Sequence, residues 1–106
     1  MEQNAFDERL HKLAMEEVGA KDWGMFYLSW ADEDKWQGCA FVPGYGPITA
    51  RLRCVAFGVK AVGQCMILRL PKGEEQPPME YRDRLLNEKE LREVYPDIKT
   101  LGEGAV

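Results

Sequence analysis

Apolar residues near the start of the chain recur every three or four positions, and this spacing predicts a helix over residues 4–18. Asn4 is expected to cap the helix, and Gly19 is expected to end it. One side is charged, so the helix is amphipathic and packs on the domain. A helix that binds a partner or a second copy of the chain shows the same pattern. The apolar positions are Phe6, Leu10, Leu13, Ala14 and Val18.

The centre of the chain, residues 23–71, predicts a strand–strand–helix–strand unit. Residues 23–30 are rich in aromatics and carry large side chains on both alternating faces, which indicates a central strand covered on both sides. A second strand is expected over residues 37–42, after a polar loop of five or six residues. The run from Pro43 to Pro47 is expected to break it. Residues 64–70 predict a third strand.

Residues 48–57 fit either a strand, by alternation, or one face of a helix. Pro47 at the start and Gly58 at the end favour the helix. A right-handed crossover through this helix makes the second and third strands parallel, with the first strand between them, in the order 2-1-3. Such a sheet has two open edges, and pairing between two copies of the chain would protect one of them.

The C-terminal third predicts a loop and one more helix. Residues 72–80 read as an exposed loop because proline, glycine and charged residues dominate them. Asn87 is expected to cap a short helix together with Glu90, and Pro96 is expected to stop it. Residues 102–106 are predicted to form a frayed tail. The chain is therefore expected to be a single α+β domain over residues 1–106, with a ββαβ core and the order αββαβα.

Charge and cysteine content narrow the classes of partner. The net charge is −4, and only the middle of the chain is mildly basic, which argues against a nucleic-acid partner. No apolar stretch has the length of a membrane span, so no membrane partner is expected. The few cysteines lie in apolar runs and no signal peptide is visible, so the expected location is cytoplasmic. The basic residues are expected to be solvated: Arg51, Arg53, Lys60 and Arg69.

No residue pattern predicts catalysis, a metal or a cofactor. His11 is the only histidine and lies on the polar side of its helix. Zinc sites use closely spaced ligand pairs, whereas Cys39, Cys54 and Cys65 are widely spaced and read as small apolar residues. Of the three, Cys54 is the only mild candidate for a reactive thiolate, because it follows an arginine. The acidic run from Asp32 to Asp34 lacks the spacing of a calcium loop.

Two sets of residues remain as candidate sites. Gly44 and Gly46 precede a predicted helix start, where backbone N–H groups attract anions, and Arg51 could add a charged donor. The alternative for this run is a tight strand-to-helix turn. Aromatic residues in loops are favoured in partner interfaces and ligand pockets. The candidate interaction residues are the aromatics Trp36 and Tyr45 on this ground, together with Arg53.

The block from Phe26 to Leu70 resembles a group of small bacterial and phage proteins of unknown function. The matching pieces are Phe26-Tyr27-Leu28-Ser29-Trp30-Ala31-Asp32, Gly38-Cys39-Ala40-Phe41-Val42, the helix ending at Gly58, Gly63, and the run from Arg84 to Leu91. Val59-Lys60-Ala61-Val62-Gly63 departs from the Asn-Pro-Gly-Gly-like turn expected there. The resemblance implies the helix at residues 48–57 and an origin in a mobile genome, and it implies no catalytic residue.

Three hypotheses of function follow, and the last of them is weak contact of the middle segment with nucleic acid. The first is a non-enzymatic interaction protein, an accessory or inhibitor protein of a phage or mobile element, which acts as a homodimer through a sheet edge or the first helix. The second is a protein or enzyme that binds a small anionic ligand between Gly44 and Arg51.

Overall fold

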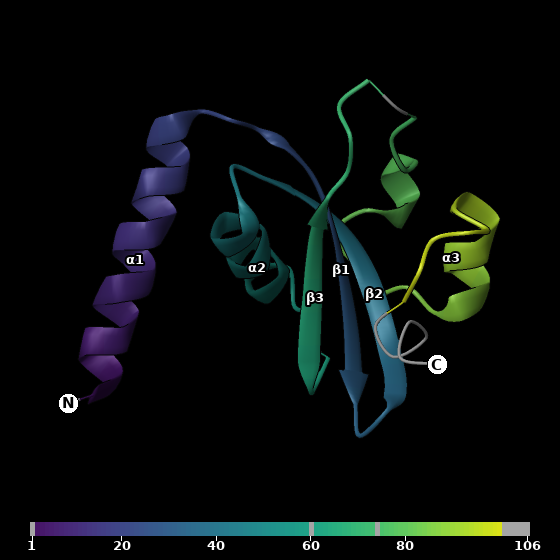
Figure 1. The fold of residues 1–106 in the computed structure, drawn as a ribbon, viewed down its shortest axis with the longest axis horizontal. Coiled ribbons are helices and arrows are strands. Elements are labelled where there is room, and N and C mark those ends of the chain that lie inside the picture. The colour runs from purple at the N-terminus through teal and green to yellow at the C-terminus, as the bar shows by residue number, and fades with distance from the viewer. Residues whose placement is uncertain (1, 60, 74, 101–106) are drawn as a thin grey trace.

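The computed structural model describes residues 2–59, 61–73 and 75–100, with side chains from residue 8 onward. It confirms an α+β fold in which a sheet of three strands lies between helices (Figure 1). The elements along the chain are α1 (Glu2–Ala20), β1 (Gly24–Asp32), β2 (Lys35–Gly44), α2 (Pro47–Ala56), β3 (Gln64–Arg69), the 3-10 turn η1 (Met79–Tyr81) and α3 (Glu88–Val94).

The strand order is β2-β1-β3, as the sequence predicted. β1 pairs with both neighbours in the antiparallel sense, so β2 and β3 run in the same direction on either side of it. Leu28, for example, lies opposite Ala40 on β2 and Ile67 on β3. Residues 25–31 of β1 are buried, which confirms the expected central strand covered on both faces.

The two faces of the sheet are covered by different parts of the chain (Figure 1). α2 covers one face, where Ala50 and Cys54 pack against Phe26, Leu28 and Trp30. Residues 75–100, here called the C-terminal cover, lie on the other face and include η1 and α3. The cover packs around the aromatic pair of this face and contributes Leu86 and Leu91. The rings of the pair, Tyr27 and Phe41, stack at 5.2 Å.

The connection between β1 and β2 is tighter than predicted. Its two central residues, Glu33 and Asp34, have φ values of 49° and 65°, as in the two-residue turn that matches the twist of a hairpin. A bulge lies just before the turn, where Trp30 pairs with Gly38 and Ala31 pairs with Trp36. The expected loop of five or six residues was wrong, because its residues continue the two strands.

β2 also extends beyond its predicted end and includes Pro43, which pairs with Met25. Antiparallel residues bond to a given neighbour at alternate positions. Because Cys39 N–H and the Phe41 carbonyl bond away from β1, the nitrogen of Pro43 also faces the outer edge. A proline there costs the ladder no hydrogen bond. The prediction that Pro43 ends the strand was therefore wrong.

α1 is longer than predicted and packs on α2 rather than on the sheet (Figure 1). It begins at Glu2, so Asn4 lies inside the helix rather than at its cap. It also passes Gly19, and Lys21 adopts the left-handed conformation at its end, with φ of 55°. Part of the predicted apolar stripe stays open to solvent, since Leu13 is 39% and Val18 40% exposed.

The C-terminal helix follows its sequence signals. The Asn87 side chain accepts from the Glu90 N–H at 2.9 Å, and Glu90 accepts from the Asn87 N–H at 3.1 Å, as the predicted capping pattern requires. The helix ends at Val94, before Pro96. Residues 72–80 hold exposed positions together with the buried Pro77 and the start of η1. The predicted tail at 102–106 lies outside the described residues, and no described helix could span a membrane.

Candidate functional site

The start of α2, a predicted anion site, is capped by a carboxylate from α1. Its N-cap residue is Gly46, which has no side chain to accept the first helical N–H groups. The Glu17 carboxylate takes this role: Oε2 accepts from Ile48 N–H at 2.9 Å, and Oε1 accepts from Thr49 N–H at 2.7 Å. A Cβ at residue 46 would overlap this carboxylate, so glycine is what lets Glu17 approach.

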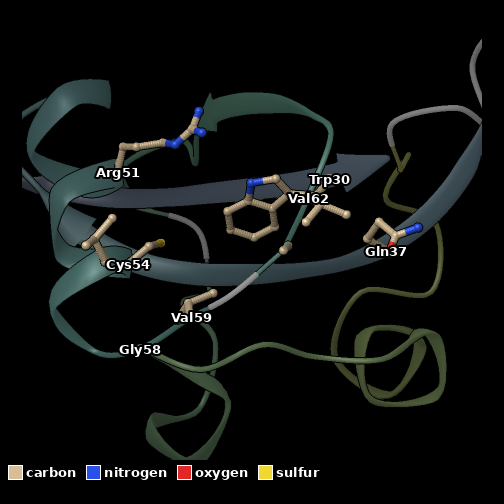
Figure 2. A pocket seen from close by; sticks show the side chains of 9 residues that line it. Trp30, Gln37, Arg51, Cys54, Gly58, Val59 and Val62 are labelled. Carbon is tan, nitrogen blue, oxygen red and sulfur yellow. The ribbon is translucent and has the colours of Figure 1, made fainter. Parts of the chain in front are cut away.

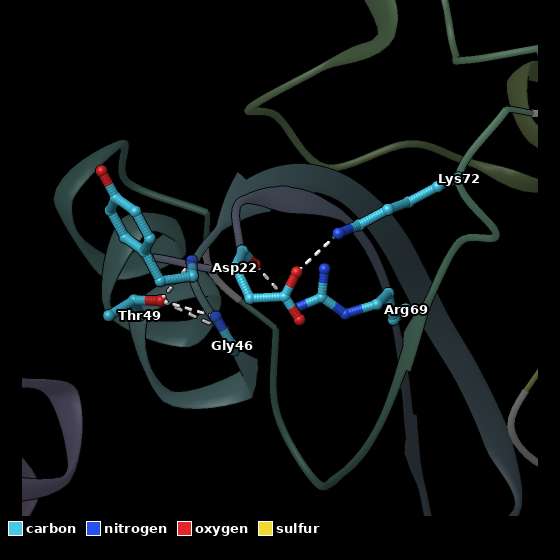
Figure 3. A network of polar contacts seen from close by, with 6 residues as sticks. Asp22, Gly46, Thr49, Arg69 and Lys72 are labelled. Carbon is cyan, nitrogen blue, oxygen red and sulfur yellow. Dashed lines mark hydrogen bonds and ion pairs between the residues drawn. The ribbon is translucent and has the colours of Figure 1, made fainter. Parts of the chain in front are cut away.

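The backbone before α2 is bonded within the chain as well. Thr49 Oγ1 accepts from the N–H groups of Tyr45, at 2.8 Å, and Gly46, at 3.1 Å (Figure 3). An external anion at this helix start would therefore compete with Glu17 and Thr49. The structure also separates the predicted residues, because Arg51 lines a groove that neither Gly44 nor Gly46 lines. Anion binding by these three residues stays a prediction.

An ionic cluster lies nearby and joins the segment after α1 to the end of β3 (Figure 3). The Asp22 carboxylate contacts Lys72 Nζ at 2.6 Å and Arg69 Nη2 at 3.5 Å. The hydrogen bond from Lys72, with the charges of Arg69 and Lys72, holds the pKa of Asp22 below its usual value. The Arg69 guanidinium also lies over the Phe26 ring, 4.6 Å from its centroid. These contacts give the cluster a structural role.

The three predicted interaction residues lie apart, and each is half-buried. Trp36 packs toward the C-terminal cover and donates from Nε1 to Ser29 Oγ at 2.8 Å. Tyr45 meets Trp23 edge to face at 4.9 Å. Arg53 binds Asp83 through two hydrogen bonds, of 2.7 and 3.2 Å, and so ties α2 to the cover. They do not form one surface.

Trp23, like Phe57, is an exposed aromatic that sequence reasoning did not single out. Its side chain is 51% exposed, although it immediately precedes the buried strand β1. Its position before the glycine that opens β1, outside the alternation of the strand, was the available signal.

A groove of about 450 Å³ opens between the second half of α2, the loop after it and the hairpin end of the sheet (Figure 2). Its volume falls within the usual range of ligand pockets. Trp30 crosses it, and Cys54 and Arg51 project into it from α2. The lining residues are Trp30, Gln37, Arg51, Cys54, Val55, Gly58, Val59, Ala61 and Val62.

The groove holds two hydrogen-bond donors without acceptors. Trp30 is 3% exposed as a whole residue, but its indole Nε1 stays in contact with solvent, and no described residue accepts from it. Arg51 is exposed, and no described carboxylate pairs with its guanidinium. The other arginine of α2, Arg53, is paired with Asp83. The groove is therefore mostly apolar, with a positive charge and an indole N–H at its wall.

The cysteines are free, and their surroundings disfavour reactive thiolates. Burial raises the pKa of Cys54 to about 11, although the charges of Arg51 and Arg53 act in the opposite direction. Burial likewise raises the pKa of Cys39 to about 12. Cys65 is half-buried rather than buried. Among the described residues, no three histidine, cysteine or acidic side chains gather as a metal site.

The two outer edges of the sheet differ. The edge of β2 is bridged by the C-terminal cover, in which Leu86 exchanges hydrogen bonds with Cys39 and Asp83 N–H donates to the Phe41 carbonyl. Within residues 2–59, 61–73 and 75–100, no strand or bridge pairs with the outer edge of β3. β3 is therefore an open edge strand.

Comparisons of this chain with protein-family models, curated proteins and solved structures find no match.

Proposed function

We propose that the protein is a small, non-enzymatic interaction protein that forms a homodimer through the open edge of β3. The observation that carries the proposal is the contrast between a bridged edge at β2 and an edge at β3 that no described residue pairs. An unpaired edge presents backbone donors and acceptors to any extended strand. The resemblance to small phage and bacterial proteins favours an accessory or inhibitor protein of a mobile element.

The backbone groups available at this edge follow from the register of the sheet. Leu70 N–H donates to the Met25 carbonyl at 2.9 Å, which fixes the alternation along β3. Residues 64, 66 and 68 therefore bond to β1, whereas the N–H and C=O groups of Cys65, Ile67 and Arg69 point outward. Three outward residues are enough for a short strand pairing centred on Ile67.

The side chains of β3 do not protect its edge. Residues 64–68, Gln-Cys-Met-Ile-Leu, carry no charge and no proline, the usual devices against edge pairing. Leu68 is 48% exposed on the face of the C-terminal cover, and Ile67 is half-buried on the face of α2. A partner strand beside β3 would remove apolar surface from water on both faces of the sheet.

The ends of β3 carry opposite charge, which favours a second copy as the partner. Gln64 starts the strand beside Ala31, so the acidic residues 32–34 lie at this end. Arg69 and Lys72 lie at the other end, where Asp22 balances only one of their two positive charges. When two copies pair antiparallel about a two-fold axis, the acidic end of each meets the basic end of the other.

Light scattering after size exclusion tests the proposal. The native chain is expected to dimerise, and Ile67→Lys is expected to give a monomer, because two lysines would face each other at the centre of the pairing. Met79→Lys is the matched control, since Met79 is 78% exposed on η1 and should leave the dimer intact. Circular dichroism checks that each variant is folded.

Hydrogen exchange on the native chain gives a second readout that needs no variant. The outward amides of Cys65, Ile67 and Arg69 should exchange more slowly as the protein concentration rises, whereas the amides of residues 66 and 68 should not change. A monomer at concentrations up to about 100 μM, with no such dependence, would overturn the proposal.

A further inference from the structure

The groove beside α2 contains binding groups that the fold itself does not use. The Trp30 indole N–H is open to the solvent of the groove, and no described residue accepts from it, so an acceptor on a ligand can replace water there. Figure 2 shows the indole lying across the groove, with the Arg51 side chain reaching over the same space from α2. The two donors therefore serve one cavity and come from two different elements.

Most of the other residues that line the groove are apolar, and several of them are exposed to solvent. Val55 is 71% and Val62 60% exposed, and Val59 and Ala61 complete a wall on the loop after α2. Exposed apolar side chains that converge on a cavity indicate a surface that an apolar body would cover. Gln37, from the hairpin, adds an amide at the other end of the cavity.

The charge of the groove indicates the sign of its ligand. Arg51 brings one positive charge, and the other basic side chain of α2 is neutralised by Asp83. One guanidinium and one neutral donor match one carboxylate, because the planar fork of arginine binds both carboxylate oxygens. A doubly charged phosphate would keep an unbalanced negative charge in a chain whose net charge is already −4.

We infer that this groove binds an organic carboxylate with an apolar body. The carboxylate accepts from Arg51 and from the indole N–H of Trp30, and the apolar body lies against Val55, Val59 and Val62. This site is distinct from the edge of β3, so the inference does not rest on dimer formation. It also differs from the helix start at Gly46, whose N–H groups are bonded to Glu17 and Thr49.

The indole resonances of the protein in two-dimensional NMR test the inference. Octanoate is the probe, and octanol is its matched neutral control. The Trp30 indole N–H signal is expected to move with octanoate until it saturates, and octanol should bind at least about tenfold more weakly. The other two tryptophans are internal controls, because Trp36 Nε1 already donates to Ser29 and Trp23 lies outside the groove.

Variants of two arginines separate specific binding from a general attraction of anions. Arg51→Gln should lower the affinity for octanoate about tenfold, whereas Arg9→Gln, which removes an exposed charge on α1, should leave it unchanged. Arg51→Lys, which keeps the charge but loses the planar fork, should give an intermediate affinity. Val62→Ser should weaken octanoate without a change in the fold.

The inference is overturned by the absence of a saturable shift of the Trp30 signal at about 10 mM octanoate. Equal affinity for octanoate and octanol, or an equal loss of affinity in the two glutamine variants, would overturn it as well. Inorganic phosphate that binds as tightly as octanoate would also overturn it, because the groove would then be a general anion site. Ile67→Lys, the variant designed to dissociate the dimer, should keep octanoate binding, so the two proposals can fail separately.

Discussion

The two outer edges of one small sheet are treated in opposite ways. At β2, Leu86 bonds to both backbone groups of Cys39, at 2.7 and 3.2 Å, and Pro43 has no N–H to leave open. At β3, the outward groups of three residues meet no described strand. Among the described residues, backbone bonds from outside the sheet therefore protect the edge of β2 and not the edge of β3. This difference is what makes β3 a better candidate for an interface than the helix faces.

The side chains at the two edges also differ in burial. This difference gives the largest expected change in the free energy of unfolding. Leu86 is 1% exposed and fills the core under the cover, whereas Leu68 is 48% exposed on β3. Leu86→Ala should lower the free energy of unfolding by about 3 kcal/mol, because it leaves a cavity. Leu68→Ala should cost under about 1 kcal/mol in the monomer.

Urea denaturation of both variants, in the monomeric background Ile67→Lys, measures the two values. Equal costs would contradict the comparison, because they would mean that β3 is as deeply packed as the edge under the cover.

Those parts of the fold that depend on residues close together in the sequence could be predicted from the sequence. β1 has large residues on both alternating faces, so its central place and the 2-1-3 order followed. Pro47 and Gly58 marked α2, and Asn87 with Glu90 marked the start of α3. In each case a few neighbouring residues determine the backbone conformation, so the pattern could be recognised without the rest of the chain.

The remaining features depend on residues far apart in the sequence. Leu86 bonds to the edge of β2, and no residue pattern near Cys39 predicts this pairing. Glu17 binds N–H groups that lie 31 and 32 residues later, so a predicted anion site proved to be capped from within the chain. The groove likewise needs Trp30 and Arg51 to converge. Such pairings depend on tertiary packing, which periodicity alone does not determine.

The contacts of α1 with α2 give the next largest effect. They extend the comparison because α1 caps α2 through the Glu17 side chain, whereas the cover also bonds to the sheet through its backbone. Glu17→Ala leaves the N–H groups of Ile48 and Thr49 without their acceptor. It should lower the free energy of unfolding by about 1–2 kcal/mol, as loss of a helix cap does. Gly46→Ala should act in the same direction by displacing the carboxylate.

Thermal unfolding with Glu16→Ala as the control measures this loss, since Glu16 is the exposed neighbour of Glu17. An equal effect of the two alanine variants would show that the bonds from Glu17 do not hold α1 to α2.

The charges at the ends of β3 give a smaller effect that sharpens the proposed pairing. Asp32→Lys and Lys72→Glu should each weaken the dimer about threefold, because exposed ion pairs contribute little. The double variant should recover most of this loss, since the reversed charges face each other again. Dissociation constants from sedimentation supply the test. A double variant as weak as the sum of the single ones would rule out the antiparallel arrangement.

The smallest expected effect is a dependence of stability on pH, and it concerns the C-terminal cover that protects the edge of β2. The hydrogen bond from Arg84 and the backbone bond at Asn87 hold the pKa of Glu90 below its usual value of 4.5. Its stabilisation is therefore complete above that value and is lost as the pH falls through the lower pKa in the folded state.

The side chains of Arg84 and Glu90 are 45% and 25% exposed, so solvent screens their ion pair and the loss should stay under about 0.5 kcal/mol. Glu90→Gln keeps the capping geometry but lacks the charge. Its stability difference from the native chain should therefore shrink between pH 6 and pH 3. Amide exchange reports where this happens: Cys39, bonded to the cover, should lose protection in acid in the native chain. The outward amide of Ile67 should show no change that depends on Glu90, because α3 does not reach that edge. The contrary result is that acid lowers protection at both Cys39 and Ile67 in the native chain and at neither residue in Glu90→Gln. Protonation of Glu90 would then loosen the sheet as a whole, rather than the cover alone.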